Sequence, residues 1–186
     1  MSEYSLEAYG TMIADRPRFE AHVRALERVV RPGDLVVEIG SSAGTFALIA
    51  ARLGARRVVA VEPSDVVQLG RECAAASGLA DRIEFVHGVS QDLALPEPAD
   101  VLVSDLRGVL PLHGGHVAAI ADARRRLLRP GGAQISRRDD LYVAVVAAPA
   151  TYDEVVGPWA DDAARGLVFG PVRERIVNRW RAATLA

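Results

Sequence analysis

Lysine is absent from this sequence, and all 22 of its basic residues are arginine. A Schiff-base lysine and the lysine of a phosphate-binding loop are therefore excluded. We attribute this absence to GC-rich codon usage rather than to function. Cysteine is nearly as scarce, because Cys73 is the single one in 186 residues, so no internal disulfide can form. The Ala-rich, helix-like stretch around Cys73 predicts a packed structural thiol.

The sequence also lacks a dominant charge, a secretion signal and a membrane-length apolar run. Its 22 basic and 24 acidic residues give a formal net charge of -2, which provides no electrostatic reason to expect a nucleic-acid partner. The N-terminus, Met1-Ser2-Glu3-Tyr4, is polar and acidic, unlike a secretion signal. No uncharged apolar run approaches the ~20 residues of a membrane span. We expect a cytoplasmic protein that binds neither nucleic acid nor membrane.

Short apolar runs alternate with helical patterns along the chain. The apolar runs predict buried strands at 35–39, 58–61, 82–87, 100–104 and 133–136, with a sixth at 141–147. Helical spacing predicts helices at 44–53, 65–77 and 114–128, after two helices within 11–30. This alternation is typical of an α/β fold with a largely parallel, doubly wound sheet, here with N-terminal helices. Such sheets bind ligands at the carboxyl ends of their strands.

The first strand ends in a glycine-containing turn, Glu38-Ile39-Gly40-Ser41-Ser42-Ala43-Gly44. A dinucleotide-binding turn has Gly at positions one, three and six, and two of these fail here because the residues are Ser42 and Thr45. A second pattern has an acid two residues before glycines at positions one, three and five. Glu38, Gly40 and Gly44 satisfy that pattern, and only Ser42 departs from it. A nicotinamide oxidoreductase is therefore the weaker hypothesis.

The next two predicted strands are also followed by residues that can form hydrogen bonds with a nucleoside. Glu62, followed by Pro63, ends the second strand, and its carboxylate can accept hydrogen bonds from both ribose hydroxyls. The alternative is that Glu62 caps the following helix, although Pro63-Ser64-Asp65 comes later and resembles the helix start. After the third strand, Ser90 and Gln91 lie in a polar turn that could contact an adenine edge.

In this order, the motifs resemble those of class I S-adenosylmethionine-dependent methyltransferases, especially the protein arginine methyltransferase group and its bacterial relatives. The resemblance includes an N-terminal helix motif, in which Asp15 is followed three residues later by Arg18. It implies a Rossmann-like methyltransferase fold and S-adenosylmethionine as the cofactor. It also assigns cofactor-binding residues, namely Arg18 at the methionine carboxylate, Glu38 near the methionine amino group, the turn residues Gly40, Ser42 and Gly44, Glu62 and Pro63 at the ribose, and Ser90 and Gln91 at the adenine.

On the acceptor side, Asp105 follows the fourth strand and is our candidate catalytic residue, which would orient the methyl acceptor. The arginine methyltransferase group has Glu at that position and a second Glu later in the loop, where this sequence has Gly114. His113 and His116 are candidate bases by their ordinary pKa range, with a surface loop as the alternative. Two histidines three residues apart, without a third ligand, do not indicate a metal site.

The resemblance divides the chain into a cofactor-binding domain, residues 1–136, and a C-terminal part, residues 137–186, similar to the connector that leads into the group's substrate domain. We expect that domain to be absent. The expected acceptor is a small molecule or a peptide, and a homodimer stays open. One alternative is an FkbM-like sugar or small-molecule O-methyltransferase, and another is a non-catalytic cofactor-binding module. The run Arg124-Arg125-Arg126 is predicted to lie on a solvated helix face.

Overall fold

The computed structural model describes residues 5–106, 115–162 and 165–179 of the chain. The chain divides into two compact units, Met1–Asp139 and Asp140–Ala186. The boundary that the sequence suggested, between residues 136 and 137, lies a few residues before this division. Each unit is described by itself below.

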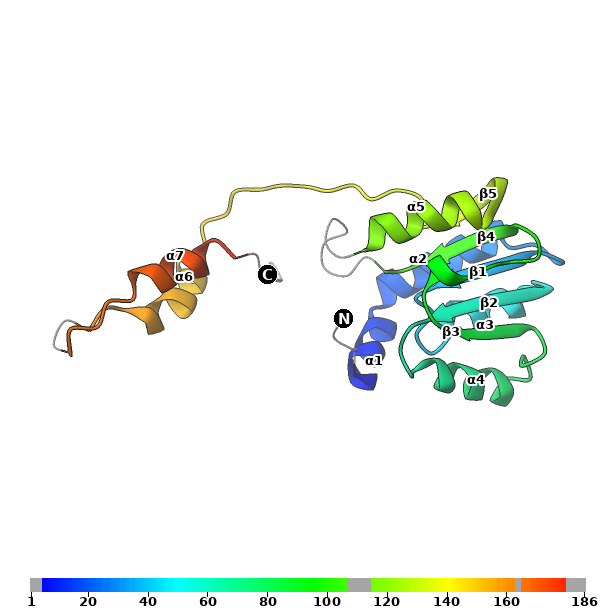
Figure 1. Ribbon diagram of the computed structural model, residues 1–186, viewed down its shortest axis with the longest axis horizontal. Coiled ribbons are helices and arrows are strands. Elements are labelled where there is room, and N and C mark those ends of the chain that lie inside the picture. The colour runs from blue at the N-terminus through cyan, green and yellow to red at the C-terminus, as the bar shows by residue number, and fades with distance from the viewer. Residues whose placement is uncertain (1–4, 107–114, 163–164, 180–186) are drawn as a thin grey trace. The chain divides into compact units, whose positions relative to one another are not determined.

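Unit 1 is built on a five-stranded parallel sheet (Figure 1). Its strands are β1 (Leu35–Ile39), β2 (Arg57–Glu62), β3 (Ile83–His87), β4 (Ala99–Ser104) and β5 (Leu128–Ile135). They lie in the order β3-β2-β1-β4-β5, with each neighbouring pair parallel. The predicted α/β fold is confirmed. The strand order reverses between β1 and β4, and a crevice for ligands forms at such a switch point.

Helices cover both faces of this sheet. They are α2 (Arg16–Val29), α3 (Thr45–Arg52), α4 (Val67–Ala76) and α5 (His116–Arg126). Helix α1 (Leu6–Ala14) has no buried residue and contacts α2. Leu26 of α2 and Val67 of α4 are buried in one core cluster with Val36 of β1. Ala123 of α5 is buried in the other cluster with Val37 of β1. Successive residues of β1 thus point to opposite faces, as strand geometry requires, and all five are buried.

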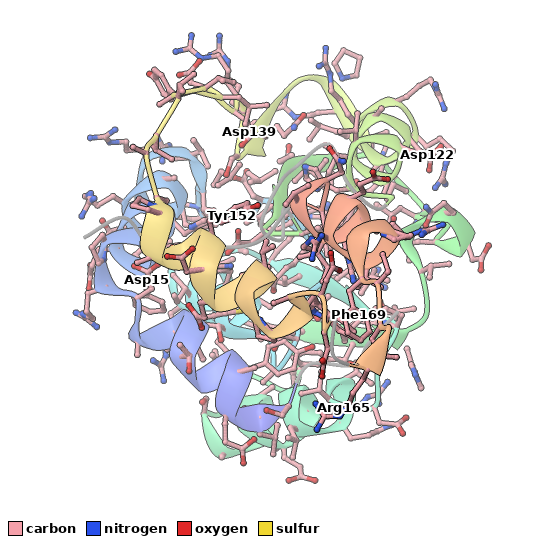
Figure 2. The ribbon with its side chains drawn as sticks, turned by 90° about the vertical axis from the view of Figure 1, so that its left-hand side faces the viewer. Asp15, Asp122, Asp139, Tyr152, Arg165 and Phe169 are labelled. Atoms are coloured by element: carbon pink, nitrogen blue, oxygen red, sulfur yellow. The ribbon has the colours of Figure 1, made fainter. Side chains whose placement is uncertain are left out.

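Asp15 lies at the junction of the two N-terminal helices (Figure 2). It is the N-cap of α2, and its side chain accepts a hydrogen bond of 3.3 Å from the backbone N–H of Arg18. Pro17, in the first turn of α2, lacks an N–H that would have no helical partner there. The three-residue spacing from Asp15 to Arg18 is therefore the spacing of a helix cap.

Three expectations from the sequence are wrong. Residues 141–147 form no strand, and Val143 and Val145 are fully exposed, because a strand needs a neighbour for its backbone hydrogen bonds. Strand β5 begins at Leu128 rather than Ala133, and its register with β4 shifts so that Ala99 faces Leu128 and Val101 faces Ala133. Cys73 is exposed rather than packed.

Unit 2 contains α6 (Pro149–Val156), a 3-10 turn η2 (Gly157–Trp159) and α7 (Gly170–Val177). The Trp159 and Phe169 rings meet edge to face at 5.6 Å, and Arg173 forms two hydrogen bonds of 3.0 Å with the Asp161 carboxylate. Among the described helices of the whole chain, none has both the length and the apolar composition that crossing a membrane requires.

Candidate functional site

The turn after β1 has a backbone that favours glycine at two positions. Gly40 has φ +71° and Gly44 has φ +80°, both in the left-handed region that side chains rarely adopt. A Cβ on Gly40 would lie 2.0 Å from a methyl carbon of Leu106, and a Cβ on Gly44 would lie 2.6 Å from the Phe85 ring. Gly40 therefore lets the Leu106 side chain approach the turn, whereas Gly44 lets helix α3 pack closely on β3.

Glu62 connects the turn after β1 to the turn after β2. One carboxylate oxygen accepts a 2.9 Å hydrogen bond from the backbone N–H of Ser42. The other accepts hydrogen bonds from the N–H and the hydroxyl of Ser64, at 3.0 and 2.7 Å. Ser42 has the unusual φ of +53° for a residue other than glycine, and its hydrogen bond to Glu62 helps to hold it there. Helix α4 begins at Val67 with Val66 as its N-cap, so Glu62 is not the cap of that helix.

Glu38 is a buried carboxyl group beneath the same turn, and its side chain accepts a 2.8 Å hydrogen bond from the Ala47 N–H in the first turn of α3. Removal from water raises the pKa of Glu38 to about 8, and the nearby negative charge of Glu62 acts in the same direction. The hydrogen bond from Ala47 opposes this shift but does not outweigh burial. Glu38 is therefore mostly protonated at neutral pH.

The turn after β3 completes one side of the crevice. Ser90 begins the short 3-10 turn η1 (Ser90–Asp92), and its hydroxyl lies 3.3 Å from the side-chain oxygen of Gln91. Ser90 is buried, whereas Gln91 is exposed. The N–H of Gly88 donates a 3.0 Å hydrogen bond to the Glu62 carbonyl. The turns after β1, β2 and β3 are thus joined by hydrogen bonds, with Glu62 common to all three.

Asp105, just past the end of β4, forms an ion pair with Arg18 of α2. The sequence assigned these two residues to the acceptor and to the cofactor respectively, and the structure brings them together. Their side chains are 16% and 33% exposed, so solvent screens this pair only in part. Arg18 has five N–H donors in a planar fork, so it can contact Asp105 and a second carboxylate at the same time.

His22 is a site residue that the sequence reasoning missed. It lies one helical turn after Arg18, its ring stacks on Phe46 at 4.7 Å, and its Nε2 lies 3.9 Å from an Asp105 oxygen. Its Nδ1 lies 3.0 Å from the Arg18 carbonyl, which can only accept, so we assign the proton to Nδ1. Nε2 is buried without a hydrogen-bond partner among the described residues. The i, i+4 spacing from Arg18 was the signal that could have identified it.

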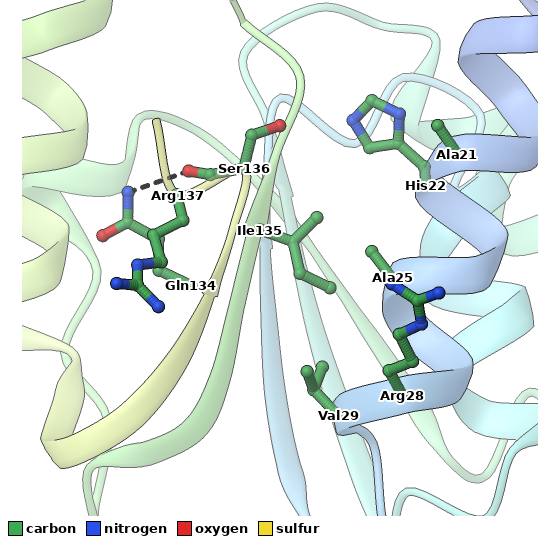
Figure 3. Close-up of a pocket in the computed structure, with 9 residues that line it drawn as sticks. All are labelled: Ala21, His22, Ala25, Arg28, Val29, Gln134, Ile135, Ser136 and Arg137. Carbon is green, nitrogen blue, oxygen red and sulfur yellow. Dashed lines mark hydrogen bonds between the residues drawn. The ribbon is translucent and has the colours of Figure 1, made fainter. Parts of the chain in front are cut away.

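A pocket of about 340 Å³ opens beside His22, between α2 and the carboxyl end of β5 (Figure 3). Apolar side chains from both elements form much of its wall, and Ile135 of β5 points toward α2. The apolar lining residues are Ala21, Ala25, Val29 and Ile135. Beyond the end of β5, the Ser136 carbonyl accepts a 3.1 Å hydrogen bond from the Gln134 side chain. A small organic group fits such a pocket by size and polarity.

The structure places the other residues considered in the sequence analysis as follows. His113 and Gly114 lie outside the described residues. His116 is the first residue of α5 and is buried rather than in a surface loop. No group of three potential metal ligands occurs in the described part of the chain. Arg124, Arg125 and Arg126 are exposed as predicted, and Arg126 also donates hydrogen bonds to the carbonyls of Ser90 and Leu93 at 2.8 and 2.9 Å.

Comparison with known proteins gives consistent matches. A family model described as a methyltransferase domain matches residues 36–132. The chain is 32% identical over 137 residues to protein arginine N-methyltransferase PRMT10 of Oryza sativa subsp. japonica. The aligned residues make up 73% of this chain and 36% of that protein. The chain is 31% identical over 137 residues to protein arginine N-methyltransferase 6 of Danio rerio, covering 73% of this chain and 39% of that protein.

Solved structures match in fold. Protein arginine methyltransferase 10 of Arabidopsis thaliana has a TM-score of 0.73 at 23% identity, covering 92% of this chain and 53% of that one. The Trypanosoma brucei PRMT1 enzyme–prozyme heterotetrameric complex with AdoHcy has a TM-score of 0.76 at 22% identity, covering 88% and 52%. The chain thus spans little more than a third of those two curated relatives and about half of the two structural neighbours.

Proposed function

The chain belongs to the family of class I S-adenosylmethionine-dependent methyltransferases, and from this premise we propose that it transfers the methyl group of S-adenosylmethionine to a nucleophile on a protein side chain or a small molecule. The observation that carries the proposal is the set of linked turns after β1, β2 and β3, with Glu62 bonded to all three. These turns lie beside the switch point of the sheet, where such folds bind ligands.

The residues present fit this cofactor. The hydroxyl of Ser41, in the glycine turn, is buried without a hydrogen-bond partner among the described residues, so a bound ligand could supply that partner. Glu62 would accept hydrogen bonds from the ribose hydroxyls, in a turn completed by Pro63. Arg18 would pair with the methionine carboxylate, since a guanidinium fork matches a carboxylate in shape and charge.

The remaining cofactor assignments are part of the same proposal. Glu38 would lie toward the methionine amino group, and Gly40, Ser42 and Gly44 would shape the turn below the cofactor. Ser90 and Gln91 would contact the adenine. The bound cofactor supplies a sulfonium-activated methyl group, so the protein has mainly to align the acceptor, and alignment is worth up to roughly 7–11 kcal/mol.

We assign the orienting role to Asp105, because it follows β4 and its carboxylate already pairs with a guanidinium, that of Arg18. An acceptor N–H or O–H would donate to the Asp105 oxygen that faces His22. A protein acceptor is favoured by the relatives, which are named as arginine N-methyltransferases. A small-molecule acceptor is favoured by the apolar pocket beside His22.

Two measurements test this function. Calorimetric titration with S-adenosylhomocysteine is expected to show one site, and titration with NAD is expected to show none. Radiolabelled S-adenosylmethionine is then offered with arginine-containing peptides and with small phenols, amines and sugars. Label in the peptides supports a protein acceptor, and label only in small molecules supports the O-methyltransferase alternative. Tight binding without transfer to any acceptor would contradict catalysis and leave a cofactor-binding module. No binding of S-adenosylhomocysteine would overturn the cofactor assignment.

Cytoplasmic location and self-association belong to the same proposal. One structural neighbour is a heterotetramer by its description, which supports association in general, and we propose that this chain forms a homodimer. Sedimentation equilibrium measures it directly. A single species at the mass of one chain, 19.9 kDa, would contradict the homodimer without affecting the cofactor assignment.

A further inference from the structure

Arg126, the last residue of α5, has contacts unlike those of the arginine next to it. The Arg125 side chain is 75% exposed, and one 3.3 Å hydrogen bond joins it to Asp122. The Arg126 side chain is 35% exposed, and it reaches from α5 to the turn that follows β3. The two neighbours therefore form a natural pair for comparison.

The guanidinium of Arg126 joins three groups at once. Its Nη2 donates to the Ser90 carbonyl at 2.8 Å, and its Nη1 donates to the Leu93 carbonyl at 2.9 Å. These two carbonyls belong to the first residue of η1 and to the residue that caps its end. Nε and Nη2 also contact the two oxygens of Asp122 on α5, at 2.6 to 3.0 Å. Asp122 thereby fixes the direction in which the fork points.

The turn needs this external support because it is short and weakly bonded internally. Its three residues have no side-chain cap, and its backbone hydrogen bonds, Asp92 to Val89 and Leu93 to Ser90, measure 3.1 and 3.3 Å. Ser90 and Leu93 are buried, so carbonyls there need partners within the protein. Asp122 holds the pKa of Arg126 above its ordinary value, and Arg126 lowers the pKa of Asp122. Both groups therefore stay charged at neutral pH.

We propose that Arg126, oriented by Asp122, is a positioning residue that fixes the 90–93 turn for recognition of the cofactor's base. The inference rests on the proposed function, because it needs Ser90 and Gln91 to face an adenine. Among the described residues, Arg126 donates hydrogen bonds to the Ser90 and Leu93 carbonyls and to the Asp122 carboxylate on its own helix. Its effect on the cofactor passes through the position of the turn, and base recognition requires that position to be held within about half an ångström.

The test compares Arg126→Ala with Arg125→Ala on the same helix. Calorimetry measures the dissociation constants of S-adenosylhomocysteine and of S-inosylhomocysteine, in which a carbonyl replaces the adenine amino group. We expect Arg126→Ala to weaken the adenine ligand by roughly tenfold, the scale of a lost charged hydrogen bond, and to affect the inosine ligand less. The preference for adenine then falls. Arg125→Ala leaves both constants within about twofold of wild type.

Two further variants keep the outcome clear if Arg126→Ala folds poorly. Arg126→Lys retains the charge, but one ammonium group cannot span two carbonyls and a carboxylate as the fork does. Asp122→Asn removes the carboxylate and leaves Arg126. Both are expected to reduce the adenine preference. An equal loss of affinity for both ligands, or no loss, would overturn the inference. Wild-type protein that fails to bind S-adenosylhomocysteine would instead overturn the proposed function.

Discussion

Burial controls the protonation of Glu38, and protonation gives this residue a measurable effect on stability. Its pKa rises to about 8 in the folded chain, from about 4.3 in an exposed chain. The folded state therefore binds more protons between these values, and its stability falls as the pH rises through them. The contribution of protonated Glu38 to the free energy of unfolding is complete below the pKa of the unfolded chain. It is lost as the pH rises through the pKa of the folded chain.

We predict that Glu38→Gln flattens this pH dependence. The Gln oxygen can still accept from the Ala47 N–H, but it has no proton to lose. Between about pH 6 and pH 8 the wild-type free energy of unfolding is expected to fall by up to about 2–3 kcal/mol more than that of the variant. Urea unfolding at both pH values measures the difference. Parallel curves for the two proteins would show that Glu38 is already ionised at pH 6.

Arg18 offers a second test at the residue scale, because a matched arginine lies on the same helix. Arg16 is 71% exposed on its side chain and pairs with Glu20, one turn further along α2. Arg18 instead faces Asp105. We predict that Arg18→Ala weakens S-adenosylhomocysteine binding by at least about tenfold, since a hydrogen bond to a charged group contributes ~1.5–3 kcal/mol.

Arg16→Ala is the control and should leave the dissociation constant unchanged. Arg18 could bind the ligand carboxylate directly or support the site as a whole. Adenosine separates these two roles because it has no carboxylate. If adenosine binding is weakened as strongly as S-adenosylhomocysteine binding, Arg18 supports the site as a whole and does not bind the carboxylate.

At the scale of elements, the turn after β1 depends on how closely α3 and α4 approach β3. The Phe85 ring lies under two glycines, because a Cβ on Gly44 or on Gly70 would come within 2.6 Å of it. Gly44 also has φ +80°, and Gly70 is in the middle of α4. A side chain at position 44 therefore meets two separate costs, backbone strain and overpacking.

We predict that Gly44→Ala destabilises the protein by about 2–5 kcal/mol, from ~1–2 for the left-handed backbone and ~1–3 for the clash. The double variant Gly44→Ala with Phe85→Leu is expected to be less destabilised than the sum of the two single variants. Denaturant unfolding of all four proteins gives the interaction energy. Simple additivity would mean that the Phe85 ring moves aside at no cost.

The sequence predicted the elements that its local pattern determines. The runs at 35–39 and 100–104 each contain three or more apolar residues out of five, and they form most of β1 and β4 within the sheet. The run at 141–147 is equally apolar and forms no strand, because a pattern shows that a segment suits a sheet but not that a neighbour is in place.

In the candidate site, the sequence predicted the residues that follow strands but not the contacts between residues far apart in the chain. Glu62, Gly40 and Ser90 follow strands, so the parallel topology alone brings them to one edge. The pairing of Arg18 with Asp105 and the reach of Arg126 to Ser90 join residues that are far apart in the chain. No local pattern contains such contacts. The sequence therefore predicted the exposure of the arginine run from Arg124 but not the hydrogen bonds of Arg126.

On the scale of the whole molecule, the apolar core belongs almost entirely to unit 1. The central strands β1, β2 and β4 contribute most of the fully buried large side chains, including Val37, Val59 and Leu102. In the described part of unit 2, Val156 is the one buried hydrophobic residue, and α6 and α7 have only eight residues each. Helices this short are marginal in water without a core.

We therefore predict two levels of stability within one chain. In hydrogen-exchange mass spectrometry, amides of α6 and α7 should exchange within seconds, while those of β1, β2 and β4 should stay protected for hours, because exchange there requires global unfolding. S-adenosylhomocysteine should slow exchange further in the turns after β1, β2 and β3, and leave α6 and α7 unchanged. Fully unfolded chain provides the reference rates. Protection of α6 and α7 equal to that of β1 would mean that unit 2 is stabilised by contacts beyond its own.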